Sequence, residues 1–147
     1  IKAINANFKD GVNGFDIDGV IHLGNGVCGI HPGPGDVIIT GRSFEEAPET
    51  LAFLRKNGIH NPVFFNQCHY EDKSRTGSGF HKAETIKLLW RAGLTIEYFF
   101  EDDEVQKTEI ERNLGEIKDV WKMPTEVIHV NNPHVKKENC RHLEDLP

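Results

Sequence analysis

The chain has 147 residues, of which 37% are hydrophobic and 27% charged, and its formal net charge is -6. This size and balance indicate one globular domain, and the acidic charge argues against binding nucleic acid through a broad basic surface. No apolar run approaches the roughly 20 residues that a membrane span needs, and the start of the chain does not read as a signal peptide.

The cysteines and histidines show no metal-binding or disulfide spacing. Cys28, Cys68 and Cys140 lie far apart without a CxxC pair, so neither a disulfide framework nor a zinc site is expected. We expect a reducing, cytoplasmic location instead. The eight histidines lack HxxxH and HExxH spacing and are expected mainly as surface or packing residues. His22 and His31, in the glycine-rich stretch described next, are candidates for substrate contact.

Short apolar runs alternate with amphipathic stretches. In chain order, the patterns predict a strand at Gly14–Ile17, a loop or small hairpin at Gly19–Pro34, a strand at Asp36–Thr40, a helix at Glu45–Lys56, a strand at Pro62–Asn66, a helix at Phe80–Arg91, a strand at Thr95–Phe100, a helix at Glu104–Leu114, a strand at Glu126–Val130 and a polar tail at 134–147. This order is typical of βα units that build an α/β domain around a mainly parallel sheet.

Polar residues stand where the predicted strands end. Asp16 and Asp18 end the first strand, Thr40 ends the second, and Asp102 and Asp103 follow the fourth. In open parallel sheets the ligand binds beyond the carboxyl ends of the strands. We therefore expect these side chains to meet at one edge of the sheet.

Asp16-Ile17-Asp18-Gly19-Val20 places two carboxylates two positions apart as the chain leaves a strand. One carboxylate can attack phosphorus and form an aspartyl phosphate. The second can give a proton to the leaving oxygen and later take one from water. The alternative is a simple acidic turn, because Asp-Gly is a common turn pair.

Thr40-Gly41-Arg42 combines a hydroxyl, backbone N–H groups and a helix start, which together suit a phosphate. The alternative is a helix cap with a surface arginine. Lys82 is predicted in the first turn of its helix, where the helix dipole disfavours a cation unless an anion binds nearby. It would then neutralise phosphoryl oxygens and keep Asp16 ionised; the alternative is a solvated lysine.

Glu101-Asp102-Asp103 follows the apolar run Tyr98-Phe99-Phe100. Three adjacent acids repel one another, and Mg²⁺, which prefers carboxylate, water and phosphate oxygens, relieves that repulsion. The alternative is a charged loop. The four signals occur in order and at strand ends, so together they predict a phosphotransfer site.

In this order the motifs resemble those of the haloacid dehalogenase-like (HAD) phosphatase superfamily, over roughly residues 12–130. Gly14-Phe15-Asp16-Ile17-Asp18-Gly19-Val20 is similar to its first motif, Val37-Ile38-Ile39-Thr40-Gly41-Arg42 to its second, Lys82 to its third and Phe99-Phe100-Glu101-Asp102-Asp103 to its fourth.

The resemblance implies a Rossmann-like sheet in the order 3-2-1-4-5 and a Mg²⁺-dependent phosphomonoester hydrolase. It implies Asp16 as nucleophile, Asp18 as acid/base, and Thr40 and Lys82 as phosphate binders, with Gly41 and Arg42 beside the substrate. The implied metal ligands are Asp16, the backbone carbonyl of Asp18 and Asp102, with Asp103 as a direct or indirect ligand.

The intervals between the motifs leave room for a flap at Gly19–Gly35 and for only a helix, a strand and a loop before Lys82. Both cap insertions of the superfamily are therefore expected to be absent or minimal, which leaves an open site. The segment from Asn66 to Asp103 also resembles, more weakly, the phosphatase half of phage polynucleotide kinase-phosphatases. That likeness implies Gln67, His69 and Arg75 along the substrate approach, and a nucleotide or nucleic-acid end as substrate.

Other functions remain open. The chain is alternatively a phosphatase of small sugar or nucleotide monophosphates, or a non-catalytic domain that binds phosphate or a partner. A receiver domain is excluded because its acids and its phosphoacceptor occur in a different order. The chain contains no GxxxxGK[ST] motif, so no kinase activity is expected.

Overall fold

The computed structural model describes residues 11–25, 27–121 and 123–131, and of the side chains at 116–121 nothing is described. The described strands form one parallel sheet in the order β3-β2-β1-β4-β5. The strands are β1 (Val12–Phe15), β2 (Val37–Ser43), β3 (Val63–Asn66), β4 (Ile96–Glu101) and β5 (Glu126–His129). The helices are α2 (Ala47–Lys56), α3 (Arg75–Arg91) and α4 (Glu104–Trp121), with two short 3-10 helices, η1 (Phe44–Glu46) and η2 (Tyr70–Asp72). The predicted Rossmann-like α/β fold and strand order are confirmed.

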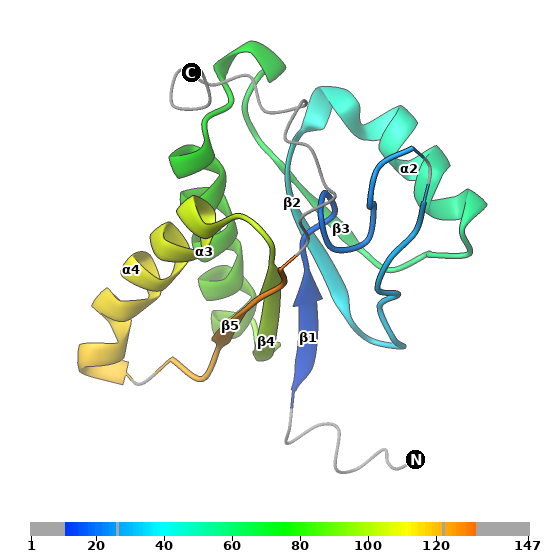
Figure 1. Cartoon of the computed structure of the whole chain (residues 1–147). Coiled ribbons are helices and arrows are strands. Elements are labelled where there is room, and N and C mark those ends of the chain that lie inside the picture. The colour runs from blue at the N-terminus through cyan, green and yellow to red at the C-terminus, as the bar shows by residue number, and fades with distance from the viewer. Residues whose placement is uncertain (1–10, 26, 122, 132–147) are drawn as a thin grey trace.

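Helices cover both faces of the sheet (Figure 1). On one face, α3 and α4 bury Ala83, Ile86 and Ile110 against Val37 and Ile39 of β2. On the other face, Leu54 of α2 packs with Ile38, Phe15 and Ile17. The alternation of Val37, Ile38 and Ile39 between the two faces follows from the period of two in a strand. The sheet is therefore buried from both sides, as its continuous apolar runs require.

An irregularity in β4 changes which residues share a face. Val12 of β1 pairs with Ile96, but Asn13 pairs with Tyr98, so β4 carries one extra residue there. As a result Ile96 and Phe99 both lie in the core under α3 and α4 despite their odd spacing. Glu101, two residues beyond Phe99, is fully buried as well.

Helix α3 begins earlier than predicted. It starts at Arg75 rather than Phe80, and Ser74 caps it by accepting a hydrogen bond from the backbone N–H of Gly77. Two glycines, Gly77 and Gly79, lower the helix propensity of this turn and hide it in the sequence. Lys82 therefore lies in the third turn of α3, and its predicted place in a first turn, with the dipole argument built on it, is wrong.

Other boundaries shift modestly. Strand β2 continues through Ser43 instead of ending at Thr40, and α4 continues to Trp121 instead of Leu114. In the predicted flap, the described residues form isolated bridges, Asp18 with His22 and His22 with Cys28, and no strand. The polar tail at 134–147, with Cys140, lies outside the described residues. Among the described helices, none has the length and apolar character to cross a membrane.

Candidate functional site

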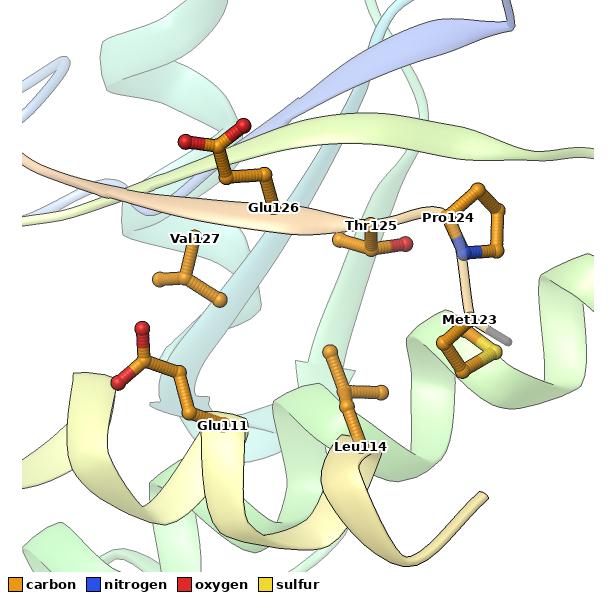
Figure 2. Close-up of a pocket in the computed structure, with 7 residues that line it drawn as sticks. All are labelled: Glu111, Leu114, Met123, Pro124, Thr125, Glu126 and Val127. Carbon is orange, nitrogen blue, oxygen red and sulfur yellow. The ribbon is translucent and has the colours of Figure 1, made fainter. Parts of the chain in front are cut away.

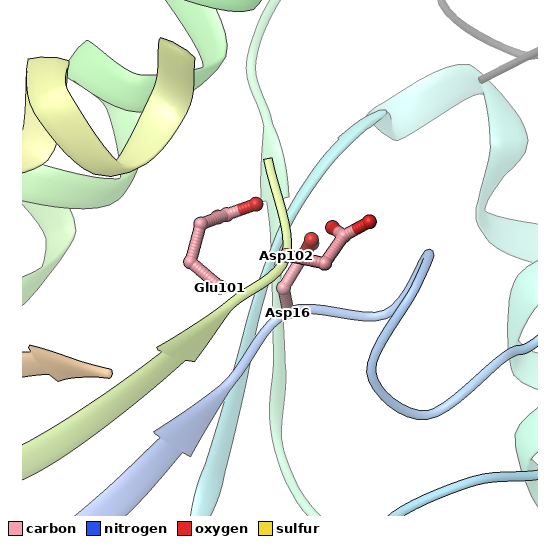
Figure 3. Close-up of side chains that lie close together, drawn as sticks. All are labelled: Asp16, Glu101 and Asp102. Carbon is pink, nitrogen blue, oxygen red and sulfur yellow. The ribbon is translucent and has the colours of Figure 1, made fainter. Parts of the chain in front are cut away.

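The predicted site residues gather at the carboxyl ends of the central strands. Asp16 directly follows β1, Glu101 ends β4, and Asp102 and Asp103 connect β4 to α4. Figure 3 shows the side chains of Asp16, Glu101 and Asp102 close together beyond the ends of these two strands. The parallel pairing of Phe15 with Phe100 brings the two strand ends to the same level. The edge rule used on the sequence therefore places these residues correctly.

The Asp16 carboxylate is buried and held through one of its oxygens. Its side chain is 7% exposed, and Oδ1 accepts a hydrogen bond from the backbone N–H of Ile17 at 2.8 Å. The same Oδ1 lies 3.0 Å from Nζ of Lys82. Both contacts fall on Oδ1, which leaves Oδ2 as the oxygen of Asp16 with capacity for another atom.

Lys82 is fully buried and sits among acceptors. Its Nζ donates to Oε1 of Glu101 and to Oε1 of Gln106, each at 2.6 Å, in addition to its contact with Asp16. Burial alone would lower the pKa of the Lys82 ammonium, but the charges of Asp16 and Glu101 outweigh burial and raise that pKa. Lys82 is therefore a permanent cation beside the Asp16 carboxylate.

Glu101 is the site residue that the sequence analysis did not assign a role. Its Oε1 accepts from Lys82, and its Oε2 accepts from the backbone N–H of Asp103 at 3.1 Å. Burial, followed by the nearby charge of Asp16, raises the pKa of the Glu101 carboxyl, and Lys82 opposes that rise. The sequence signal that could have identified Glu101 as buried is its spacing, because residues two apart in a strand share a face and Phe99 lies in the core.

Asp16, Glu101 and Asp102 form the one carboxylate cluster within the described residues that has metal-binding proximity. Each offers an oxygen, and the three oxygens lie within 4.8 Å of one another. Even with Glu101 protonated, as its raised pKa favours, the carboxylates of Asp16 and Asp102 exceed the single ammonium of Lys82 by one formal negative charge. A divalent cation with a preference for hard oxygen ligands matches both the donors and the charge.

The two oxygens of Glu101 are already occupied by Lys82 and Asp103, so the residues that fit a Mg²⁺ ion best are Asp16 and Asp102. Mg²⁺ in proteins is commonly held by one or two carboxylates plus water and phosphate oxygens. Gly19 closes the site on the flap side with a φ of 90°, and a Cβ there would overlap the Asp102 carboxylate. Only glycine therefore permits this approach of the flap to Asp102.

Asp18 is paired with Arg42 rather than with the carboxylate cluster. Arg42 donates from Nε to Oδ2 at 2.9 Å and from its terminal nitrogen to Oδ1 at 2.7 Å, a bidentate ion pair. Burial raises the pKa of Asp18, but the Arg42 hydrogen bonds and charge exceed that effect, so its pKa lies below the usual value. The Asp18 side chain remains 36% exposed, and Nδ1 of His22 lies 3.9 Å from its Oδ1.

Thr40, Gly41 and Arg42 occupy a bulge at the end of β2. Ile39 pairs with Phe64 and Ser43 with Asn66, so three residues of β2 stand opposite one of β3. The Thr40 hydroxyl accepts from the backbone N–H of Arg42 at 3.0 Å. A Cβ on Gly41 would lie 2.7 Å from Oγ of Ser78 on α3, so this segment passes tightly against the helix that carries Lys82.

Asp103 is separated from the carboxylate cluster by its own partners. Arg75 donates to it at 2.9 Å and 2.6 Å, and Nε2 of Gln106 donates to its Oδ2 at 3.0 Å. Its Oδ1 also accepts from the backbone N–H of Val105. The geometry thus favours Asp102 over Asp103 for direct metal contact, and it ties Arg75 to Asp103.

The interval between Thr40 and Lys82, in which a cap was expected to be minimal, contains η1, α2, β3 and η2, and the two short helices η1 and η2 contact each other. They are joined by an ion pair between Lys73 and Glu46 at 2.9 Å and by a contact between His69 and Glu45 at 3.0 Å. Phe44, 42% exposed, contacts the His69 ring. Of the other residues predicted on the approach, Gln67 donates to the backbone carbonyl of Phe65.

A separate pocket lies between α4 and β5 (Figure 2). It is lined by Glu111, Leu114, Met123, Pro124, Thr125, Glu126 and Val127. Glu126 is the first residue of β5, so the pocket lies toward the amino ends of the strands, whereas Asp16 lies at their carboxyl ends.

His31, the second flap histidine, contacts Sγ of Cys28 at 3.2 Å.

Comparison of the chain with protein-family models, with curated proteins and with solved structures finds no match. The functional assignment therefore depends on the chemistry of the site itself.

Proposed function

We propose that this chain is a Mg²⁺-dependent phosphomonoester hydrolase that acts through an aspartyl phosphate on Asp16. The observation that carries the proposal is the arrangement of Asp16, whose Oδ1 is held by Lys82 and the Ile17 N–H while Asp102 lies within ligand distance. A carboxylate that is fixed through one oxygen presents the other in a constant position. Such positioning and charge neutralisation supply most of the rate in phosphoryl transfer.

In the first step a carboxylate oxygen of Asp16 bonds to phosphorus as the bond from phosphorus to the ester oxygen breaks, and the leaving oxygen takes a proton. In the second step a water attacks phosphorus, the bond from phosphorus to Asp16 breaks, and phosphate leaves with Asp16 restored. The water gives up one proton in this step. Asp18 is the proposed carrier of both protons.

The pairing with Arg42 bears on the role of Asp18. It lowers the pKa of Asp18 and so favours the ionised form. The ionised form is the one that accepts a proton from the attacking water, so the geometry supports the base role of Asp18 more directly than its acid role.

A Mg²⁺ ion held by Asp16, Asp102 and the backbone carbonyl of Asp18 would neutralise charge on the phosphoryl group. The proposed substrate contacts come from Thr40, Gly41, Arg42 and Lys82. Arg75, which binds Asp103, is a further proposed substrate contact. The substrate is a phosphorylated molecule, and we propose a nucleotide or nucleic-acid end as its class. Between Thr40 and Lys82 the described chain holds only the end of β2, η1, α2, β3, η2 and the start of α3, and this lack of a large insertion supports a bulky substrate of this kind.

The test is hydrolysis of a generic aryl phosphate with Mg²⁺, in wild type and in Asp16→Asn. The variant should keep the fold, measured by circular dichroism, and lose activity on the order of a thousandfold or more, the scale of losing a covalent nucleophile. Excess EDTA should stop turnover by the wild type. Activity of the variant above about a tenth of wild type would reject the nucleophile, and an unchanged rate in EDTA would reject the metal.

The substrate class is tested by a panel of mononucleotides, 3′- and 5′-phosphorylated oligonucleotides, sugar phosphates and a phosphopeptide. A preference for nucleotides or oligonucleotide ends supports the proposed class. A preference for free sugar phosphates would reject it and favour a small-molecule phosphatase.

A further inference from the structure

The ammonium of Lys82 is saturated by the protein itself. A lysine side chain has three N–H donors and no acceptor. Within the described residues these donors meet Oδ1 of Asp16 at 3.0 Å, Oε1 of Glu101 at 2.6 Å and Oε1 of Gln106 at 2.6 Å. With Nζ fully enclosed, a phosphoryl oxygen can bind Lys82 only by replacing one of these acceptors.

The three acceptors are not equivalent. Asp16 and Glu101 are buried acids, and Lys82 is the cation bound to both, so separating either acid from Lys82 removes the partner that stabilises it in the interior, which is strongly destabilising. Gln106 is neutral, so its replacement leaves no buried charge behind. The amide oxygen of Gln106 is therefore the acceptor that costs least to replace.

Gln106 also lies where an incoming phosphate would need an oxygen. Its Oε1 is 2.6 Å from Nζ of Lys82 and 3.7 Å from the position of a Cβ on Gly41, in the bulge of β2. Its Nε2 donates to Asp103, which is itself held by Arg75. The amide oxygen thus lies near two of the proposed phosphate contacts, while the amide nitrogen is held by Asp103.

We propose that Gln106 is a positioning residue whose amide oxygen occupies, on Lys82, the place that a phosphoryl oxygen takes when substrate binds. This inference rests on the proposed function. In the free protein the amide keeps Lys82 hydrogen-bonded and aimed at Asp16. On binding, the phosphoryl oxygen takes over the hydrogen bond from Nζ, and Gln106 stays attached to Asp103 through Nε2.

The test uses two substitutions of similar size and inorganic phosphate as the probe. Gln106→Met removes the competing acceptor, so phosphate in the presence of Mg²⁺ should bind about five- to tenfold tighter, the effect of one net hydrogen bond. Gln106→Glu supplies a charged acceptor, which competes more strongly and repels the anion, so phosphate should bind at least about tenfold more weakly. Binding is measured by isothermal titration calorimetry.

Steady-state kinetics add a readout that a purely structural role would not move. KM for an aryl phosphate should fall in Gln106→Met and rise in Gln106→Glu, with a smaller change in kcat, because Gln106 does not touch the reacting atoms. Glu111→Gln, an exposed change on the same helix, is the control and should leave phosphate binding unchanged.

Unchanged or weaker phosphate binding by a folded Gln106→Met, with its melting temperature preserved, would overturn the inference. If Gln106→Met does not fold, Gln106→Glu provides the test. Phosphate binding by Gln106→Glu that equals or exceeds the binding by the wild type would then overturn the inference. A wild type that hydrolyses phosphate esters while both variants bind phosphate normally removes only this inference. A wild type that neither binds phosphate nor hydrolyses an ester overturns the proposed function with it.

Discussion

At the scale of single residues, the acidic side chains of the site are held by separate cations. Asp16 contacts Lys82, Asp18 is paired with Arg42, and Asp103 is paired with Arg75. Each pair fixes the direction of a carboxylate that would otherwise be repelled by its neighbours. An acidic side chain is also held by a basic one at the exposed contact between His69 and Glu45.

The contact between His69 and Glu45 gives a prediction for a single titration. The hydrogen bond and charge of Glu45 raise the pKa of His69 above its usual value of 6.5. The contact is then complete below pH 6.5 and is lost as the pH rises through the higher folded pKa. In Glu45→Gln the pKa of His69 should fall toward 6.5, as followed by NMR chemical shifts of the imidazole ring.

His81 is the internal control for that titration. Burial lowers the pKa of His81 to about 4, and its ring contacts the backbone carbonyl of Phe64 instead of Glu45. The pKa of His81 should therefore be the same in Glu45→Gln as in wild type. An unchanged pKa of His69 in the variant would show that the contact with Glu45 does not exist in solution.

At the scale of elements, the position of Lys82 depends on how closely α3 approaches α4. A Cβ on Gly79 of α3 would lie 2.7 Å from Cβ of Glu109 and 3.0 Å from the backbone oxygen of Gln106 on α4. Gly79 thus allows the contact between helices that places Gln106 beside Lys82. The close packing of α4 therefore requires a glycine at this position, although glycine lowers the helix propensity of α3.

Gly79 of α3 and Gly115 of α4 give opposite predictions for the same substitution. Gly79→Ala should lower the free energy of unfolding by about 1–3 kcal/mol because the added methyl overpacks the interface. Gly115→Ala in α4 should raise it by about 0.5–1 kcal/mol, because alanine is the better helix former and no described atom lies within 4 Å of the added Cβ.

Urea unfolding measured by circular dichroism checks both substitutions. Gly115→Ala serves as the control for the intrinsic effect of alanine in a helix. A stabilising Gly79→Ala would mean that α3 and α4 are farther apart in solution than the structure has them.

At the scale of the whole molecule, the sheet brings three carboxylates together from β1 and from the end of β4, at a cost in repulsion that only the folded state carries. A cation that binds this cluster binds the folded state alone. By mass action it therefore stabilises the fold, by about 2.7 kcal/mol at a concentration 100 times its Kd.

We therefore expect Mg²⁺ to raise the melting temperature of the wild type, and EDTA to reverse the rise. Asp102→Asn should reduce the rise, because the amide replaces a charged ligand. Glu126 is an exposed acid at the amino end of β5, away from the carboxyl ends where the cluster lies, so Glu126→Gln should leave the rise in melting temperature unchanged. An equal rise in Asp102→Asn, measured by differential scanning fluorimetry, would show that the ion binds elsewhere.

The alternation of apolar runs and helical patterns was sufficient to predict the strands, the α-helices and the parallel sheet of the described residues, but not the 3-10 helices η1 and η2. It also located Asp16 and Asp102, because residues that follow parallel strands share one end of the sheet. The strand order followed from the resemblance to HAD phosphatases and is confirmed by the pairing of β1 with β2 and β4. The phosphatase function and its metal remain predictions.

The tertiary structure alone decided which charges are partners. Nothing local in the sequence assigns Glu101 and Gln106 to Lys82, or Asp103 to Arg75, since these pairs join α3 to the last residue of β4 and to residues that follow it. The start of α3 at Arg75 was missed for a related reason, because Gly79 lowers local propensity in exchange for a contact with α4. Periodicity reports which face of an element is buried, whereas ion pairs depend on which buried faces meet, and only packing settles that.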